Sequence, residues 1–461
     1  MTNYAITSRG KRTQRACQPF MLLLLTALAI LIPRIGAAQS TTYGTIYSFN
    51  LSPDGGEPEG ALVIGKNGAL YGTTYGGGAS GLGTVFELTK PAGGSWQENV
   101  LYSFSGSDGQ NPESPLVFGN TGALYGVTVG GGGEGSTGVA FELAPPSAAG
   151  GAWTDTVLYV FSGSIENSAP NGPLLFGPGG TLYATTRSVT DESGLVVALQ
   201  PPTTPAGAWT ESVLYSFGGP PAGKQPFAGV VSEGRSLFGT TGYGGDKYCI
   251  PPDGCGIIYE LTPPATLGSA WTESTLYTFT GGSDGELPEA PLAIGPGGAL
   301  YGTTYYGGSG VCYVEGGFLT KGCGAVFQLT PPSSSGAPWT YSVIYNFTGA
   351  DGDGAAPVAG VAVGKDGAIY GTTPSGGSAA SASACLPTYH VIAGCGIVFE
   401  LTPPPLPGGA WTETILHSFS GTDGDGAIPL GSLTLSSAGI LYGTTSAGGT
   451  AGRGTVFAIV P

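Results

Sequence analysis

One stretch of the chain reads PEGALVIGKNGALYGTTYGGGASGLGTVFELTKPAGGSWQENVLYSF (residues 58–104), and six similar stretches occur elsewhere in the sequence. Each holds a proline followed four residues later by Leu or Val, then runs like Leu-Tyr-Gly-Thr-Thr, Val-Phe-Glu-Leu and Leu-Tyr-Ser-Phe. The prolines and their partners are Pro58/Leu62, Pro112/Leu116, Pro170/Leu174, Pro226/Val230, Pro288/Leu292, Pro357/Val361 and Pro429/Leu433. Seven occurrences in register predict a repeat architecture.

Each repeat predicts four short β-strands, because its runs of 4–8 residues are rich in β-branched and aromatic types and are bounded by Gly or Pro. No segment after the N-terminal region keeps a 3.6-residue apolar period, so almost no helix is expected. Four strands for each repeat favour a propeller blade over a solenoid coil. The predicted fold is therefore all-β: a seven-bladed β-propeller of four-stranded blades.

The phase of the repeat predicts how the ring closes. The chain after residue 38 starts with a lone fourth strand, Thr45-Ile46-Tyr47-Ser48-Phe49, and ends on a third strand, Thr455–Ile459. We expect the N-terminal strand to complete the last blade, which would pair an otherwise open sheet edge. The Asp-Gly loops between blades and the variable second-to-third loops should then share one face, opposite the loops that lead into the six tryptophans.

The N-terminal region reads as a signal peptide. Basic residues from Arg9 to Arg15 precede an apolar run from 20 to 32, and Gly36-Ala37-Ala38 suits cleavage before Gln39. The domains expected are a signal peptide at 1–38 and a propeller at 39–461. The run is too short to span a bilayer comfortably, so an uncleaved anchor is the lesser reading. Cys17 lies before the run, which argues against lipidation of a mature N-terminus.

Charge excludes several classes of partner. Five of the 14 basic residues and none of the 30 acidic ones lie in 1–38, so the remaining chain carries 9 against 30, a net charge near −21. Such a surface repels phosphate backbones, so neither nucleic acid nor an anionic membrane is expected as a partner. A secreted protein, extracellular or periplasmic, with no membrane span in the mature chain is the expectation.

The repeats also carry a family resemblance. The run Leu300-Tyr301-Gly302-Thr303-Thr304, followed by Gly324-Ala325-Val326-Phe327-Gln328-Leu329, resembles the GloVer tandem repeat of secreted bacterial proteins. The resemblance covers the whole chain after the signal peptide and implies an exported propeller without an assigned activity. Members often have a C-terminal surface anchor, whereas this sequence stops at Pro461. The resemblance implies no catalytic residues.

Six cysteines lie in three second-to-third loops, two in each, and so predict local disulfides. The expected bridges are Cys249–Cys255, Cys312–Cys323 and Cys385–Cys395. An exported protein meets an oxidising compartment, and closing loops this short should contribute about 2–3 kcal/mol each. A metal site is the rival reading, but no CxxC pair is present and only His390 lies nearby.

The same loops are rich in aromatic residues, which suggest a ligand-binding rim on blades four to six. Rigid aromatic side chains can stack on sugars or anchor a protein partner at low entropic cost. The less specific reading is that the bridges protect glycine-rich loops and the tyrosines merely cover the blades. The candidate binding residues are Tyr243, Tyr248, Tyr305, Tyr306, Tyr313, Phe318 and Tyr389.

Two loops suggest calcium as the only candidate cofactor. Asp351 and Asp353, and likewise Asp423 and Asp425, place two carboxylates two residues apart in glycine turns, and Ca²⁺ prefers clustered oxygen ligands. Asp-Gly is also an ordinary turn signal, and related loops carry one acid or none.

Catalytic signals are weak. Acidic residues recur at the same third- and fourth-strand positions, whereas a catalytic pair should occur once, so we interpret them as solvated structural positions. They are Glu87, Glu142, Glu260 and Glu400, and Glu98, Asp155, Glu211, Glu273 and Glu413. His417 replaces the Tyr of Leu-Tyr-Ser-Phe and reads as a packing substitute. No nucleophile-elbow motif accompanies His417 or His390.

The sequence therefore favours a non-catalytic binding or structural module that contacts carbohydrate or an extracellular protein at the rim of blades four to six. The alternative is a carbohydrate-active hydrolase or lyase that uses unrepeated acids of that rim, Asp246, Asp253 or Glu315. A purely structural envelope component is the third reading.

Overall fold

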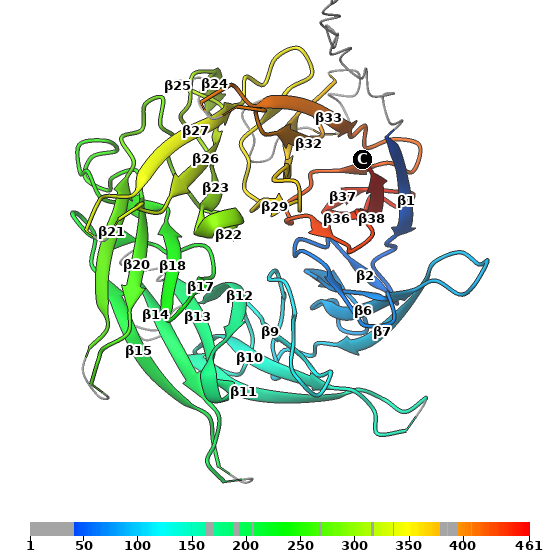
Figure 1. The fold of residues 1–461 in the computed structure, drawn as a ribbon. Coiled ribbons are helices and arrows are strands. Elements are labelled where there is room, and N and C mark those ends of the chain that lie inside the picture. Colours follow the sequence, from blue (N-terminus) through cyan, green and yellow to red (C-terminus); the bar gives the residue numbers. More distant parts are fainter. Residues whose placement is uncertain are drawn as a thin grey trace, which may run out of the picture. The chain divides into compact units, whose positions relative to one another are not determined.

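Seven antiparallel sheets of four strands surround a common axis in the computed structural model of the protein (Figure 1). No α-helix occurs among the described residues, only two 3-10 turns, Pro178–Gly180 and Pro296–Gly298. The predicted seven-bladed propeller is thus confirmed. The structure describes residues 41–148, 150–162, 169–187, 193–204, 207–266, 270–314, 318–334, 336–378, 385, 394–406 and 408–461.

The strands of the blades run outward from the axis in chain order. Blade one contains β3 (Val63–Ile64), β4 (Leu70–Thr74), β6 (Thr84–Thr89) and β7 (Gln97–Ser103). Blade two contains β8 (Val117–Phe118), β9 (Leu124–Val127), β10 (Ser136–Ala144) and β11 (Thr154–Ser162). Blade three contains β12 (Pro170–Phe176), β13 (Leu182–Arg187), β14 (Gly194–Gln200) and β15 (Thr210–Phe217).

Blades four to six follow the same order. Blade four contains β17 (Val231–Glu233), β18 (Ser236–Thr241), β20 (Ile257–Thr262) and β21 (Thr272–Thr278). Blade five contains β22 (Ala293–Ile294), β23 (Leu300–Thr304), β26 (Ala325–Thr330) and β27 (Thr340–Asn346). Blade six contains β29 (Ala362–Val363), β30 (Ile369–Thr373), β32 (Ile397–Thr402) and β33 (Thr412–Ser418).

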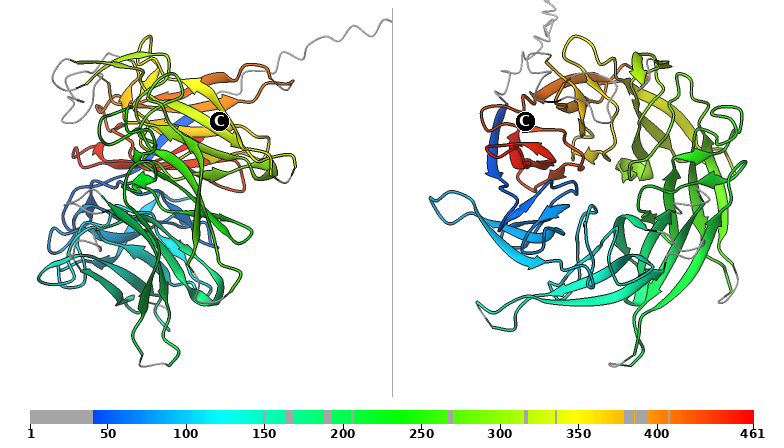
Figure 2. Two further views of the ribbon diagram at one scale, coloured as in Figure 1. Left: turned by 90° about the vertical axis from the view of Figure 1, so that its left-hand side faces the viewer. Right: turned by 180° about the vertical axis from the view of Figure 1, so that it is seen from behind.

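The seventh blade is closed by the N-terminal strand, as the phase of the repeat predicts. It contains β35 (Thr434–Leu435), β36 (Leu441–Thr445), β38 (Thr455–Val460) and β1 (Thr42–Ser48). The antiparallel register runs from Thr42 opposite Val460 to Ser48 opposite Thr455. In Figure 1 the blue β1 lies beside the red β38, and the right-hand view of Figure 2 shows the same ring from behind. The outer edge of β38 is thereby paired rather than exposed.

A glycine in the second strand lets the sheets pack closely. Gly72 lies opposite Phe86 in the ladder, and a Cβ at Gly72 would stand 2.6 Å from the Phe86 ring. Blade three carries Ala184 at this position, and there the facing residue is the smaller Val197. The two substitutions compensate each other, because the shorter side chain leaves room for the added methyl group.

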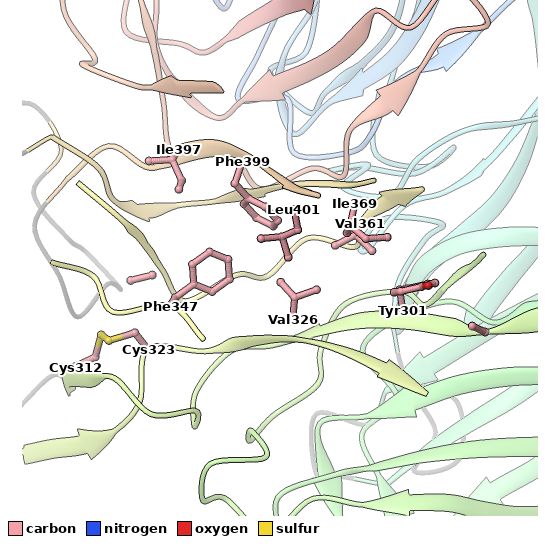
Figure 3. Packing of buried hydrophobic residues seen from close by; sticks show 12 residues of the cluster. Tyr301, Cys312, Cys323, Val326, Phe347, Val361, Ile369, Ile397, Phe399 and Leu401 are labelled. Atoms are coloured by element: carbon pink, nitrogen blue, oxygen red, sulfur yellow. A yellow bond between two sulfur atoms is a disulfide. The ribbon is translucent and has the colours of Figure 1, made fainter. Parts of the chain in front are cut away.

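Neighbouring blades pack through a repeated aromatic pair. The fully buried fourth-strand Phe of one blade meets the third-strand aromatic of the next, as Figure 3 shows for Phe347 and Phe399. Their ring centroids lie 5.2 Å apart in an edge-on arrangement, a geometry that adds to the hydrophobic burial. The other pairs are Phe49/Phe86, Phe104/Phe141, Phe217/Tyr259, Phe279/Phe327 and Phe419/Phe457.

A buried hydrogen bond near the axis joins the same neighbours. The first Thr of the Leu-Tyr-Gly-Thr-Thr run donates to the carbonyl two residues after the repeat proline of the next blade. The bonds are Thr73–Ser114, Thr185–Ala228, Thr240–Ala290, Thr303–Ala359, Thr372–Gly431 and, across the closure, Thr444–Gly60. This bond explains why the first threonine recurs from repeat to repeat.

The junction between blades two and three lacks both contacts. Val127 replaces the donating Thr, and Val197 replaces the third-strand aromatic that would meet Phe161. Gly172 takes a φ of 78° at the position of the accepting carbonyl, a left-handed conformation that favours glycine. Six junctions therefore share one set of contacts and one does not.

The two faces of the ring carry the loops that were predicted for them. The loop entering a blade pairs with the start of that blade's second-to-third loop in four two-stranded ladders: β2 (Gly55–Gly56) with β5 (Gly76–Gly77), β16 (Gly223–Lys224) with β19 (Tyr243–Gly244), β28 (Gly354–Ala355) with β31 (Ser375–Gly376), and β34 (Gly426–Ala427) with β37 (Ala447–Gly448). These loops thus share one face, called the loop face below.

Candidate axial binding site

A pocket opens on the ring axis and is lined by the residues that follow the seven repeat prolines. Its volume is about 240 Å³, and every blade contributes to its wall. The lining is Glu59–Ala61, Glu113–Pro115, Asn171–Pro173, Phe227–Ala228, Glu289 with Pro291, Val358–Ala359 and Leu430–Ser432. At six of the seven junctions an inter-blade threonine bond ties the backbone at this level to the neighbouring blade.

The residue directly after the proline differs from blade to blade. In order around the ring it is Glu59, Glu113, Asn171, Phe227, Glu289, Val358 and Leu430. Blades one to three give the pocket a polar arc, and blades six and seven give it an apolar arc. The fold requires the proline and the buried Leu or Val of each segment but does not fix the residue directly after the proline. Because this residue differs from blade to blade, it determines which polar and apolar groups line the pocket.

The three carboxyl groups of the pocket are poorly solvated. Burial, together with the charges of Glu113 and Glu57, raises the pKa of Glu59 to about 8. Burial raises the pKa of Glu289 to about 7 and that of Glu113 above its usual value, and in both cases the Arg187 charge opposes the rise. Poorly solvated carboxyl groups at an open pocket offer their hydrogen-bonding capacity to a ligand.

Arg187 lies at the end of β13, beside the pocket. Its guanidinium carbon stands 5.4 Å from the centre of the Phe227 ring, a cation–π distance. Gly242 makes room for this cluster, since a Cβ there would lie 2.6 Å from the Phe227 ring and 3.6 Å from the Glu289 Cγ. Phe227, Glu289 and Arg187 therefore form one group on the side of blades three to five.

Two of the predicted aromatic residues join this group. Tyr305 and Tyr306 are half-buried, with ring centroids 4.3 Å apart. Their backbone pairs with Glu286 and Leu287, just before the repeat proline of blade five. The charge of Glu289 contributes to the raised pKa of both phenols, after the larger effect of burial. They thus lie close to the axial carboxyl groups.

The remaining predicted aromatics do not line the pocket or lie outside the described residues. Tyr243 is half-buried, with its ring 6.4 Å from that of Phe227. Tyr248 is 76% exposed and lies under Lys247, whose Nζ is 5.1 Å from the ring centre. Tyr313 and Phe318 belong to a hairpin of β24 (Val311–Val314) and β25 (Phe318–Lys321), which gives their place but not the direction of their side chains. Tyr389 lies outside the described residues.

All three predicted disulfides are present. Cys249 bonds to Cys255, Cys312 to Cys323 and Cys385 to Cys395, with Cα separations of 5.6, 5.2 and 5.2 Å. Sulfur atoms in a disulfide are not available as thiolate ligands, so the metal reading of these loops does not fit.

The disulfides also have a packing role. A Cβ at Gly281 would stand 2.3 Å from the Cys249 sulfur, and one at Gly421 would stand 3.0 Å from the Cys385 sulfur. Both glycines have positive φ and lie in the loop that leads to the next blade. Two of the three bridges therefore pack against the loop that leads to the next blade.

The two loops predicted to bind calcium use their inner carboxylates as turn caps. Asp353 accepts hydrogen bonds from the Thr348 amide and hydroxyl, both at 2.7 Å. Asp425 accepts from the Ser420 amide at 2.8 Å and the Tyr43 hydroxyl at 2.6 Å. Both inner carboxylates therefore already cap their turns, and calcium binding at these loops stays a prediction. Asp351 and Asp423 are exposed, with φ of 55° and 54°.

The acids of the predicted catalytic alternative have structural partners where they can be described. Asp253 forms an ion pair of 2.8 Å with Lys224, and Asp246 accepts a bond of 3.0 Å from the Tyr248 amide. Neither lines the axial pocket. Glu315 lies outside the described residues.

The repeated acids of the fourth strands are half-buried, and two of them form contacts between blades, which corrects the expectation of fully solvated positions. Tyr345 of blade five donates to Glu413 of blade six at 2.6 Å, and Tyr159 donates to Glu211 at 3.1 Å. Burial raises the pKa of Glu98, Asp155 and Glu413 to about 7, with a nearby Asp adding to each rise. At the closure, His417 stacks on Tyr43 with centroids 3.5 Å apart, which confirms its packing role.

The axial residues are the candidates that sequence reasoning missed. The search for function followed loop length, cysteines and aromatics, which lead to the rim. The available signal was the position after each repeat proline, where three acids, an amide and an aromatic replace one another in an otherwise regular segment.

The chain belongs to the family described as the Gloeobacter/Verrucomicrobia repeat. The family model matches residues 34–250, 204–377 and 310–461, so together the matches cover the propeller. This confirms the family resemblance of the repeats. No curated protein matches the chain.

Similar solved structures are distant. PorZ, a surface component of the type-IX secretion system of Porphyromonas gingivalis, is 12% identical, with a TM-score of 0.45 over 90% of this chain. This chain spans about half of PorZ, 48%. The polysaccharide lyase Uly1 is 10% identical, with a TM-score of 0.45 over 90% of this chain and 91% of its own. A Lactobacillus plantarum protein is 14% identical, with a TM-score of 0.46 over 82% and 88%. Likenesses this weak carry no argument about the site.

No helix among the described residues has the length and apolar character needed to cross a membrane. The three disulfides fit an oxidising compartment, such as the periplasm or the cell exterior.

Proposed function

We propose that the protein is an exported, non-catalytic binding module that holds a saccharide in the axial pocket. The observation that carries this proposal is the pocket itself, where seven repeats present seven positions and fill them with different chemistry. Residues 1–38 act as the export signal and residues 39–461 as the mature propeller. This places the site next to the Tyr305–Tyr306 part of the predicted rim rather than on the rim as a whole.

The two arcs of the pocket match the two kinds of surface on a sugar ring. Hydroxyl groups need donors and acceptors, which Glu59, Glu113 and Asn171 supply. The apolar faces of a sugar ring need flat or aliphatic surfaces, which the side chains of Phe227, Val358 and Leu430 supply. A pocket of about 240 Å³ lies at the small end of ligand sites, so it suits one sugar unit or a chain end.

The test is a glycan array probed with residues 39–461, followed by calorimetric titration of each hit. We expect Phe227→Ala and Tyr306→Ala to weaken binding at least tenfold with little change in melting temperature. Tyr248→Ala, which removes a rim aromatic of blade four, is the matched control and should bind as the unmodified protein. If Tyr248→Ala loses binding while Phe227→Ala keeps it, the site is the outer rim. If no glycan binds, an extracellular protein becomes the expected partner.

A second candidate function is saccharide hydrolysis or elimination. It is favoured by Glu59, whose pKa of about 8 keeps a proton available at neutral pH beside the Glu113 carboxyl, as a general acid requires. This reading predicts turnover of a bound saccharide that disappears in Glu59→Gln. Binding without turnover in the unmodified protein would exclude it for that ligand.

A further inference from the structure

Arg187 stands beside the pocket, next to the lining residue Phe227, and has no ion-pair partner in the described part of the chain. The Nε of Arg187 is buried and makes no hydrogen bond there. Its interactions are the contact with Phe227 and the longer-range attraction of Glu113 and Glu289. An arginine normally satisfies its planar set of donors with a carboxylate, a phosphate or carbonyl groups.

The position of Arg187 is a departure from the repeat. The residue after the two threonines is Tyr75, Val129, Arg187, Gly242, Tyr305, Pro374 and Ser446 in the seven blades. Only blade three places a cation there, and this cation meets Phe227 of blade four. Ring closure does not require this residue, because the other blades manage without a cation.

We infer that the pocket takes an acidic saccharide and that Arg187 binds its anionic group, a carboxylate or a sulfate. This inference rests on the saccharide-binding function proposed above. The Arg187 guanidinium carbon lies 5.4 Å from the Phe227 ring, and Gly242 lets that ring pack against the backbone. The planar set of donors of a guanidinium is suited to two parallel hydrogen bonds with an oxyanion. The Asn171 amide and the glutamates remain for hydroxyl groups.

The electrostatics of the pocket allow an anion to enter. With a pKa of about 8 for Glu59 and about 7 for Glu289, these carboxyl groups are mostly protonated at pH 6 and offer O–H donors instead of negative charge. The whole chain carries a formal net charge of −16, so it repels polyanions at long range. Retention of an acidic saccharide would therefore reflect a specific contact and not ion exchange.

The experiment compares acidic saccharides with matched neutral ones by titration at pH 6. Pectate and alginate oligosaccharides are measured beside the same oligosaccharides after reduction of the carboxyl groups to alcohols. Dextran sulfate beside dextran tests a sulfate in place of a carboxylate. We expect at least tenfold tighter binding of one acidic form than of its neutral counterpart. In Arg187→Gln this preference should fall to about one.

Two further variants keep the test decisive. Arg187→Lys keeps the charge but loses the planar pair of donors, so it should retain only part of the preference. Arg235→Gln, at an exposed turn outside the pocket, should keep all of it. Equal binding of acidic and neutral forms would overturn the inference and leave the saccharide proposal intact. Preference for a cationic saccharide such as chitosan would overturn it as well, and binding of none of these probes would overturn both.

Discussion

Blade three and its junction with blade two differ from the rest of the ring in a way that separates fold from function. Six junctions share an aromatic pair and a threonine bond to the next blade. The seventh has Val127 and Val197 instead, and a positive-φ glycine at the expected acceptor. The same blade supplies Asn171 and Arg187 to the axial site. In a protein made of repeats, the positions that the fold leaves open, and the blade that departs from the pattern, are where chemistry specific to this protein can accumulate.

Loss of an aromatic pair should have the largest effect on stability. Phe104→Ala removes a fully buried ring between blades one and two and should lower the free energy of unfolding by about 3–5 kcal/mol. Phe161→Ala removes the equivalent ring at the exceptional junction, where blade three offers no aromatic partner because Val197 stands in its place. Its cost should be about 1 kcal/mol smaller. Denaturant titration of both variants checks the difference, and equal or reversed costs would mean that the aromatic pair adds nothing to burial.

Loss of an inter-blade threonine bond should have a smaller effect. Thr444→Val removes the donor to the Gly60 carbonyl across the ring closure, a buried bond of 3.0 Å. The unpaired carbonyl should cost about 1–2 kcal/mol of unfolding free energy. Thr450→Val, an exposed position on the same blade, is the control and should change stability by less than about 0.5 kcal/mol. Val127 is the valine that blade two carries at the position equivalent to Thr444. An unchanged denaturation midpoint for Thr444→Val would show that this valine does not lower the stability of the protein.

The outer acids should make stability depend on pH. Glu98, Asp155 and Glu413 have folded-state pKa values of about 7, above their unfolded values near 4. The folded protein therefore binds these protons more tightly. Their contribution is fully present below the unfolded pKa and is lost as pH rises toward 7.

The expected loss between pH 5 and pH 8 is about 1 kcal/mol for each of these groups, since all three retain some solvent contact. The triple variant Glu98→Gln, Asp155→Asn, Glu413→Gln should flatten the melting temperature between these pH values. Asp425 acts in the opposite direction, because bonds from His417 and Tyr43 outweigh its burial and hold its pKa at about 2. Stability should therefore fall again in strong acid. Melting curves across pH 2–9 check both limbs.

Calcium provides the smallest expected effect. The inner carboxylates of the two Asp-Gly-Asp-Gly loops already accept bonds from their own loops. We expect the same melting temperature with calcium and with a chelator. A higher midpoint in calcium would restore the two loops as metal sites.

The sequence predicted the ring because each strand carries its own signal and each core position recurs seven times. It also predicted the closure, from a lone fourth strand at one end and a missing one at the other, and the disulfides, from cysteines within single loops. The role of the fourth-strand acids was predicted less well, since Glu211 and Glu413 meet their phenol partners only across the gap between two blades.

The axial pocket was out of reach for a related reason. Glu59, Glu113 and Glu289 are separated by more than fifty residues from one to the next, and only the closed ring brings them together. Their carboxyl groups become unusual through burial at the axis, which no local pattern shows. The register of the repeat identifies the positions directly after the prolines as neighbours at the axis. It does not show that the carboxyl groups there have raised pKa values.

The central claim is that the axial carboxyl groups bind ligand while the outer ones hold blades together. The most direct measurement is calorimetric titration of the array-selected saccharide into Glu113→Gln and Glu98→Gln, the same substitution at the two radii. We predict at least tenfold weaker binding for Glu113→Gln and unchanged binding for Glu98→Gln. Unchanged affinity in Glu113→Gln, or an equal loss in Glu98→Gln, would contradict this account.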